Sequence, residues 1–259
     1  SRSMHKSQGF GSTGTRGKQT EYLEFLKGEF PQDTTNIFDG INTSWSRIEG
    51  GVAIGKILNP LLDSFNFQDP STIVPQLVEA YRLLKDTKQG HWRSIKLKEL
   101  EELIVACSGV FLEAVANKES INPMGAYTLK VEAINRGANK ITLSKITTAS
   151  GLILSSKEIV LLSNEKENLE LEVTSQNKVP STAYWLKSKG TLGMYSAPKD
   201  LIGLPQTPAA EQISFTLNID NTALQILKDV VYKFNDPVDG EVYRPFNVLP
   251  KASASIAEK

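Results

Sequence analysis

Cysteine and histidine are scarce in this sequence. Cys107 is its only cysteine, which excludes an intrachain disulfide and a thiolate zinc cluster. The two histidines, His5 and His91, have no second histidine at the spacing of a metal-binding motif, and H-E-x-x-H does not occur. A catalytic zinc ion usually takes three protein ligands from His, Glu, Asp and Cys. The chain alone is therefore not expected to build a histidine-rich metal site.

Long apolar runs and a net charge are also absent. No stretch approaches the ~18 apolar residues that a membrane helix needs, and the first residues, SRSMHKSQ, lack a signal-peptide core. Lysine plus arginine and aspartate plus glutamate each number 29. No net field therefore draws the protein to nucleic acid or to an anionic membrane, although local patches remain possible. We expect no nucleic-acid partner and no membrane span.

The chain does contain helical periodicity between residues 50 and 121. GVAIGKILNPLLDSF has helical apolar spacing with a predicted break at Pro60, and Asp69 or Ser71 is the expected cap of the next helix. The segment IKLKELEELIVACSGVFLEAVANK has apolar residues at helical spacing from Leu97 to Ala114, including Val110 and Phe111, and predicts a third helix. The face of the second helix that we expect to be buried carries Ile73, Leu77, Ala80, Tyr81 and Leu84.

From Pro123 onward the apolar period changes to two. AYTLKVEA, NLELEV and ISFTLNI alternate apolar and polar residues, and turn signals such as NRGAN and IDNT separate the alternating runs. About seven such strands without an intervening helix predict an antiparallel, immunoglobulin-like (Ig-like) β-sandwich over residues 122–259. The insert LKSKGTLGMYSAPKDLIGLPQTP is too rich in Gly and Pro for a strand and is expected to be an ordered loop.

Residues 1–49 are rich in Gly, Ser, Thr and Asn and read as loops that need another body of protein to pack on. Gly9, Gly11 and Gly14 spell G-x-G-x-x-G, but no strand precedes them, as a dinucleotide site requires. The polar, glycine-rich start indicates a chain cut from something longer. Two interpretations stay open for this loop: a flexible terminus, or a wall where His and Arg meet an oxyanion or a metal. Its polar residues are His5, Lys6, Gln8 and Arg16.

Single residues elsewhere have mostly structural interpretations. His91 in KQGHWRS is expected at a turn between helices, and Cys107 is expected to be a small buried hydrophobe rather than a nucleophile. Trp45 and Trp185 are either loop anchors or platforms for a sugar ring. A Ser-His-Asp triad is unsupported because G-x-S-x-G does not occur.

Four segments together point to a family. HKSQGFGSTGTRGKQTEYLEFLKG, FDGINTSWSRIEGG, YWLKSKGTLGMYSAPKDLIGLPQTPAAE and DVVYKFNDPVDGEVYRPFNVLP resemble the long PIG-L (LmbE-like) deacetylases of Bacteroidetes-type bacteria. In those proteins helices and an Ig-like β-sandwich follow an α/β deacetylase domain. The resemblance implies an α+β multidomain chain: residues 1–49 are a remnant of the deacetylase domain, 50–121 a helical segment and 122–259 the sandwich.

The resemblance also implies chemistry. The family is one of zinc-dependent hydrolases that remove acetyl groups from N-acetylglucosamine-type amines, using an A-H-P-D-D-type motif and a later H-x-x-H-type motif. This sequence has no A-H-P-D-D, and its H-K-S-Q matches the later motif only at His5, with Gln8 at the position of the usual zinc ligand. By resemblance, His5 and Arg16 face the catalytic cleft. The implied substrate-binding residues are Lys6, Trp45 and Arg47.

We expect this chain alone to be inactive and to hold no zinc, although the parent family uses zinc. Its expected partners are an N-acetylated amino sugar or glycan and the missing N-terminal catalytic half, in the periplasm or at the cell surface. A non-catalytic carbohydrate-binding or structural sandwich, using Trp185, Tyr195 or Trp45, is the alternative. A scaffold whose helices dimerise is a third.

Overall fold

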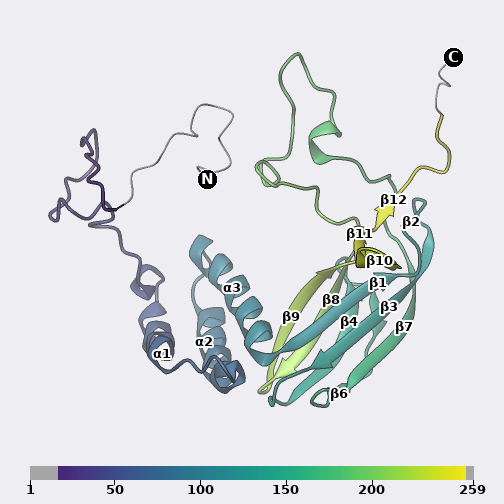
Figure 1. The fold of residues 1–259 in the computed structure, drawn as a ribbon, viewed down its shortest axis with the longest axis horizontal. Helices are drawn as coiled ribbons and strands as arrows, with labels where there is room; N and C mark the ends of the chain where they lie inside the picture. Colours follow the sequence, from purple (N-terminus) through teal and green to yellow (C-terminus); the bar gives the residue numbers. More distant parts are fainter. Residues whose placement is uncertain (1–16, 255–259) are drawn as a thin grey trace. The chain divides into compact units, whose positions relative to one another are not determined.

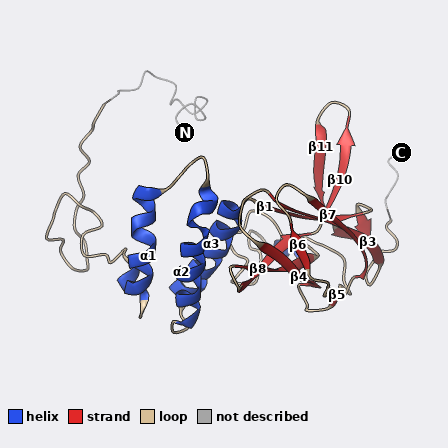
Figure 2. Ribbon diagram, turned by 90° about the horizontal axis from the view of Figure 1, so that it is seen from below, coloured by secondary structure: helices blue, strands red, loops and turns tan. Residues whose placement is uncertain are grey.

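The structure is a computed structural model that describes residues 17–254, and these residues belong to two units. The first unit is Ser1–Thr43, and its described part, residues 17–43, contains no helix or strand. The second unit, Ser44–Lys259, holds every helix and strand of the described chain (Figure 1). Figure 2 shows that the second unit is mixed α+β, with its helices and its strands in separate parts.

Three α-helices open the second unit within the described chain. They are α1 (Gly51–Ser64), α2 (Val74–Asp86) and α3 (His91–Ser108), and α2 packs against both of the others. A single-turn helix, η2 (Trp45–Arg47), precedes α1. A second one, η3 (Pro70–Ile73), leads directly into α2.

The predicted buried face of the second helix is confirmed, and Asp69 is a cap as predicted, but of the single turn η3 that leads into α2. The Asp69 carboxylate accepts hydrogen bonds from the backbone N–H of Ser71 (3.2 Å) and from its hydroxyl (2.5 Å). These bonds satisfy donors that the first turn leaves without intrahelical partners. The residues predicted on the buried face are all buried, namely Ile73, Leu77, Ala80, Tyr81 and Leu84.

The predicted break at Pro60 is wrong. Helix α1 runs through this residue to Ser64. A proline inside a helix removes one backbone donor and crowds the preceding turn, but Pro60 lies on the exposed side. Ile57 and Leu61 pack against the core on either side of it in sequence. Packing of this apolar stripe therefore outweighs the local cost of the proline.

The predicted helical stripe from Leu97 to Ala114 is a helix followed by a strand. Helix α3 ends at Ser108, where Gly109 adopts φ 67° and its N–H bonds back to the carbonyls of the last turn. This left-handed cap is favoured by glycine. Strand β1 (Val110–Ala116) follows at once. The helical prediction for Val110, Phe111 and Ala114 is wrong, and the helical segment ends at 108 rather than 121.

The strands form a β-sandwich. One sheet has the order β11-β10-β1-β3-β7, and the other has β5-β4-β8-β9 with β6 also on β4. Most pairs are antiparallel, but β1 pairs with β10 in parallel, and β12 and β2 form a separate two-stranded parallel sheet. Placing β1, β3 and β7 in one sheet and β4, β8 and β9 in the other is the strand division of Ig-like sandwiches. The remaining bounds are β2 (Ser120–Ile121), β3 (Ala126–Asn135), β4 (Ile141–Thr148), β5 (Ile153–Ser155), β6 (Ile159–Leu161), β7 (Lys166–Thr174), β8 (Gln212–Ile219), β9 (Thr222–Asp229), β10 (Val231–Asp236), β11 (Gly240–Pro245) and β12 (Asn247–Val248).

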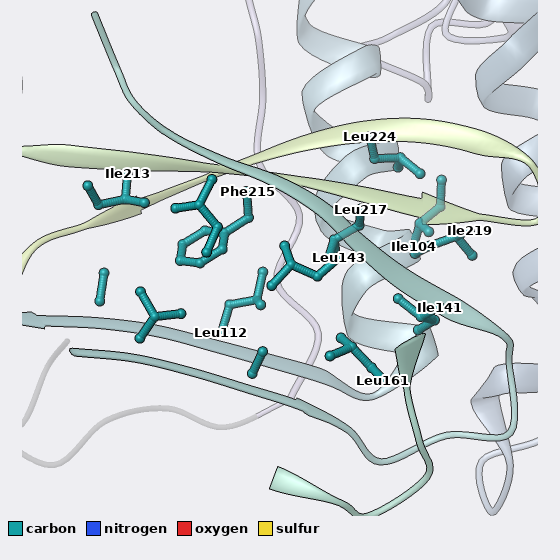
Figure 3. Packing of buried hydrophobic residues seen from close by; sticks show 14 of the residues in the cluster. Ile104, Leu112, Ile141, Leu143, Leu161, Ile213, Phe215, Leu217, Ile219 and Leu224 are labelled. Atoms are coloured by element: carbon teal, nitrogen blue, oxygen red, sulfur yellow. The ribbon is translucent and has the colours of Figure 1, made fainter. Parts of the chain in front are cut away.

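One buried cluster fills the sandwich and continues into the helices. Alternate residues of β3 and β8 point inward, as the two-residue period predicts, and Phe215 is fully buried at its centre. Figure 3 shows Leu112, Leu143 and Leu217 from the two sheets in this cluster. Ile104 of α3 belongs to the same cluster. The helical part and the sandwich therefore share a core.

Polar contacts add to this junction. The guanidinium of Arg82 on α2 donates to the hydroxyl of Thr222 (2.5 Å) and to the backbone carbonyl of Asp220. Asp220 and Asn221 form the β8–β9 turn with φ 48° and 57°, which is the geometry of a type I′ hairpin. Arg82 thereby ties the second helix to a tight turn of the sandwich.

We predict that Gly109→Ala destabilises the chain by about 1–2 kcal/mol, because an alanine must adopt the left-handed conformation there. Its Cβ would also lie 3.3 Å from the Gly137 nitrogen. Gly90, at the other end of α3, has extended backbone with no atom within 4 Å of an added Cβ. Gly90→Ala should therefore stay within about 0.5 kcal/mol of the parent. Urea unfolding measures both, and equal effects would contradict the role of Gly109.

Candidate functional site

The structure describes two of the six predicted site residues. His5, Lys6, Gln8 and Arg16 lie outside the described residues, so their roles stay predictions. Trp45 and Arg47 are both in the single turn η2, immediately before α1.

Trp45 packs against α1. A Cβ added at Gly55 would lie 3.2 Å from Trp45 Cβ and 3.3 Å from its Cδ1, so a larger residue there would push the indole away by a few tenths of an ångström. The backbone carbonyl of Trp45 also approaches Gly51. The side chain is partly buried against the hydrophobic core. These contacts are those of an anchor for the start of the helix, one of the two interpretations open for this tryptophan.

Arg47 contacts an aromatic residue that sequence reasoning did not select. Its guanidinium carbon lies 4.2 Å from the ring centroid of Trp92, and the ring of His91 meets Trp92 edge-on at 5.1 Å. Trp92 is 38% exposed, and a cation–π contact at such a site contributes about 0.5–1 kcal/mol. The only sequence signal was the adjacency of His, Trp and Arg in KQGHWRS. The cluster offers a cation, an imidazole and an aromatic surface, but no nucleophile.

A cluster of titratable groups with shifted pKa values lies on β1, β10 and β11. Lys233 Nζ lies 2.6 Å from Glu113 and 3.1 Å from Glu241. The Tyr243 hydroxyl donates to Glu113 Oε1 (2.6 Å) and lies 2.9 Å from Glu241 Oε2. Glu113 is only 8% exposed. Its Oε2 pairs with Lys233, and its Oε1 accepts the hydrogen bond from Tyr243.

The pKa shifts of this cluster follow from its hydrogen bonds. The bond to Glu113, with burial and Glu241 adding to it, raises the pKa of Tyr243 to about 12. The bond to Glu113 likewise raises the pKa of Lys233, and the Tyr243 and Lys233 bonds lower the pKa of Glu241. Perturbed groups often mark functional sites, but Lys233, Tyr243 and Glu241 find their partners within the cluster itself. We interpret them as the tie that holds the β10–β11 hairpin, which extends beyond the other strands in Figure 2.

A polar cleft lies where the helices meet the sandwich. It has a volume of about 630 Å³, within the range of small-molecule sites. The Asn139 amide nitrogen donates to the Ser71 carbonyl (3.4 Å), while its buried oxygen has no hydrogen-bond partner among the described residues. Amide and hydroxyl groups of this kind suit a neutral ligand rich in hydroxyls. The cleft is lined by Val74, Pro75, Asn139, Lys140, Thr142, Glu158, Asn218, Ile219, Asp220 and Asn221.

The described part of the chain contains no cluster of metal-ligating side chains, and its one cysteine is packed in the core. Residues 17–254 contain no group of three or more His, Cys, Asp or Glu side chains that could hold a metal ion. Cys107 is packed in the core as predicted, and burial raises the pKa of its thiol. Over the same residues, no helix has the length and apolar character needed to cross a membrane.

No protein-family model matches the chain, and no curated protein is significantly similar to it. Among solved structures, the CARDB domain of a Pyrococcus furiosus protein matches with TM-score 0.26 and 10% identity, over 54% of this chain and 86% of that chain. A β-glucosidase from Erythrobacter marinus has TM-score 0.23 and 10% identity, over 47% of this chain and 15% of its own. A β-glucosidase from Listeria innocua has TM-score 0.22 and 9% identity, over 47% of this chain and 16% of its own. We draw no functional argument from likenesses this weak.

We predict that Tyr243→Phe flattens the alkaline loss of stability. The folded pKa of Tyr243, about 12, exceeds the ordinary 10.0. Its stabilising contribution is therefore complete below pH 10 and is lost as the pH rises toward 12. Urea unfolding between pH 8 and 12 should show a shallower decline for the variant. Tyr195→Phe, in the exposed β7–β8 loop, is the control, and parallel curves for Tyr243→Phe and the parent would refute this assignment.

Proposed function

We propose that the chain is the C-terminal part of a PIG-L (LmbE-like) deacetylase-related protein. In this proposal residues 1–49 complete a catalytic domain that another body of protein supplies. The helices and the Ig-like sandwich form the non-catalytic part that carries this segment. The sequence segments already quoted support the family, and the exposed side chains of residues 17–43 support the need for a partner.

The described residues of the first unit expose an unusual amount of apolar surface. They have only local order: the Asp39 carboxylate accepts the backbone N–H of Gln32 (2.6 Å) and of Asp33 (3.1 Å), and Phe25 meets Phe30 edge-on. Burying one large apolar side chain contributes about 1.5–3 kcal/mol, so association with a complementary protein surface is strongly favoured. The exposed large apolar residues are Tyr22, Leu23, Phe25, Leu26, Phe30, Ile37, Phe38 and Ile41.

The proposal assigns roles to this chain's residues in the assembled protein. His5 and Arg16 would stabilise the negative charge that develops on the substrate carbonyl oxygen. Lys6, Trp45 and Arg47 would contact the N-acetylated amino sugar. Zinc, where the parent binds it, supplies an activated water and polarises the amide. Because the described residues hold no fitting ligand set, we assign them no step of that chemistry.

We predict that the native protein, isolated through an antibody to the sandwich, contains a segment or co-purifying chain with a His-Pro-Asp-Asp motif. Its total mass should exceed 28.5 kDa, and it should release acetate from an N-acetylglucosamine substrate in a zinc-dependent way. In that preparation His5→Ala should lower kcat about 10²-fold or more, with His91→Ala as the control. A native mass of 28.5 kDa with no partner and no acetate release would overturn the proposal.

The polar cleft favours a second candidate function, which is carbohydrate binding without catalysis. Its amide-rich lining could pair with sugar hydroxyls, and it sits between two parts that share a core. Trp185, which meets Tyr184 edge-on at 4.9 Å, is the stacking residue that the sequence offers for the same function.

We predict for this second candidate that the intact chain binds soluble glycans on an array, and that Asn218→Ala weakens binding by about tenfold, the effect of one lost hydrogen bond to a neutral partner. Trp185→Ala tests the stacking alternative in the same screen. Binding that neither substitution changes, or no binding by the parent, would refute the carbohydrate function without bearing on the deacetylase proposal.

A further inference from the structure

The long loop between β7 and β8, residues 175–211, has a firmly held base. The side-chain amide of Asn177 donates to the Ala210 carbonyl (2.6 Å) and to Glu211 Oε1 (2.8 Å). Further along the loop, the backbone N–H of Tyr184 donates a hydrogen bond to Thr207 Oγ1 (3.1 Å). Its hydroxyl donates to the Leu204 carbonyl (3.1 Å). The loop, green in Figure 1, is thus an ordered connection, as its sequence predicts.

The loop carries a tight turn, which we call the Leu192 turn (residues 190–195). Thr191 and Met194 exchange backbone hydrogen bonds of 3.0 and 3.2 Å. Gly193 has φ 77°, which favours glycine at this position of the turn. A Cβ at Gly190 would come within 2.9 Å of the Met194 carbonyl oxygen. Glycine at both positions therefore builds a turn that places Leu192 at its tip.

The side chains of this turn are apolar and unusually exposed. The relative exposure is 104% for Leu192, 68% for Met194 and 67% for Tyr195. The two exchanged bonds pair the N–H and C=O groups of Thr191 and Met194, but not those of Leu192 and Gly193. The side chains of the tip therefore suit the interfacial region of a bilayer, where unpaired peptide groups stay hydrated, rather than its hydrocarbon core.

The charge around the tip is mainly positive. Lys187, Lys189 and Lys199 flank it and all three are exposed, while Asp200, next to Lys199, is the first acidic residue on either side of the tip within residues 176–200. No ion pair of the described residues involves these three lysines. The chain as a whole has a formal charge of zero. The Leu192 turn is thus a local basic patch around an apolar tip.

We propose that the Leu192 turn docks the protein on an anionic lipid bilayer, with Leu192 and Met194 inserted at the interface. An aromatic ring such as Tyr195 favours the headgroup level, and lysines near an anionic surface are attracted to it. The charge complementarity favours an anionic surface, and the aliphatic tip offers a sugar no hydrogen-bonding group. Apolar area combined with basic charge is the pattern of peripheral membrane contacts. The proposal does not depend on the deacetylase assignment.

Co-sedimentation of the intact chain with vesicles tests this inference. The probes are phosphatidylcholine vesicles with and without phosphatidylglycerol, at low and at physiological salt. We expect binding that requires the anionic lipid and weakens with salt. Leu192→Ser with Met194→Ser, and separately Lys187→Gln with Lys189→Gln, should each lower binding by about tenfold or more.

Matched controls change the same residue types elsewhere. Leu62→Ser removes another strongly exposed leucine, on α1, and Lys98→Gln removes a lysine of α3. Both should bind as the parent does, and circular dichroism should show that every variant is folded. Vesicle binding that ignores lipid charge, that survives the tip substitutions, or that is absent would overturn the proposal. Loss of a co-purifying protein from the tip variants, without vesicle binding by the parent, would make the turn a protein-docking element instead.

Discussion

The left-handed cap at Gly109 is the constraint on which the second unit depends. It turns the last residue of α3 directly into β1 without an intervening loop. Gly137 packs against this point so closely that a Cβ there would meet the Ser108 carbonyl oxygen at 2.4 Å, and Arg136 N–H bonds to the Gly109 carbonyl (3.0 Å). Two glycines from distant parts of the chain thus let the helix end and the β3–β4 turn interlock. Since no linker remains at this place, the helices and the sandwich share one core.

The same turn explains why a polar cleft persists beside that core. Asn135 is 2% exposed, yet its side chain donates to the carbonyls of Asn139 (2.9 Å) and Leu161 (3.2 Å) and accepts the N–H of Gly137 (3.0 Å). A buried amide with its groups satisfied fixes the backbone around it. It therefore sets the position of Asn139, which lines the cleft. Arg82 holds the opposite wall through the Asp220 turn.

Periodicity in the sequence predicted those parts of the fold that are decided locally. The alternating strands β3 and β8 and the buried face of α2 follow from the side on which each residue lies. The predicted break at Pro60 and the predicted helix through Val110 are wrong because tertiary packing decides both. A proline on an exposed face is tolerated, and Gly109 with its positive φ ends a helix whose apolar pattern continues. Apolar spacing alone cannot distinguish VFLEAVA in a helix from VFLEAVA in a strand. The site features depend on contacts such as that of Lys233 with Glu113, 120 residues apart, and no local pattern in the sequence predicts such a pair.

Two exposed apolar surfaces of opposite charge suggest two kinds of partner. Residues 17–43 contain two lysines and five acidic residues among aromatic and aliphatic side chains, a mixed surface that suits a protein with complementary charges. The Leu192 turn is flanked by three lysines and one acidic residue, Asp200. An anionic bilayer would repel the acidic segment and attract the basic turn, so one surface cannot replace the other. If both proposals hold, residues 17–43 bind a catalytic partner protein and the Leu192 turn binds a membrane, so that the two contacts use separate surfaces of the chain.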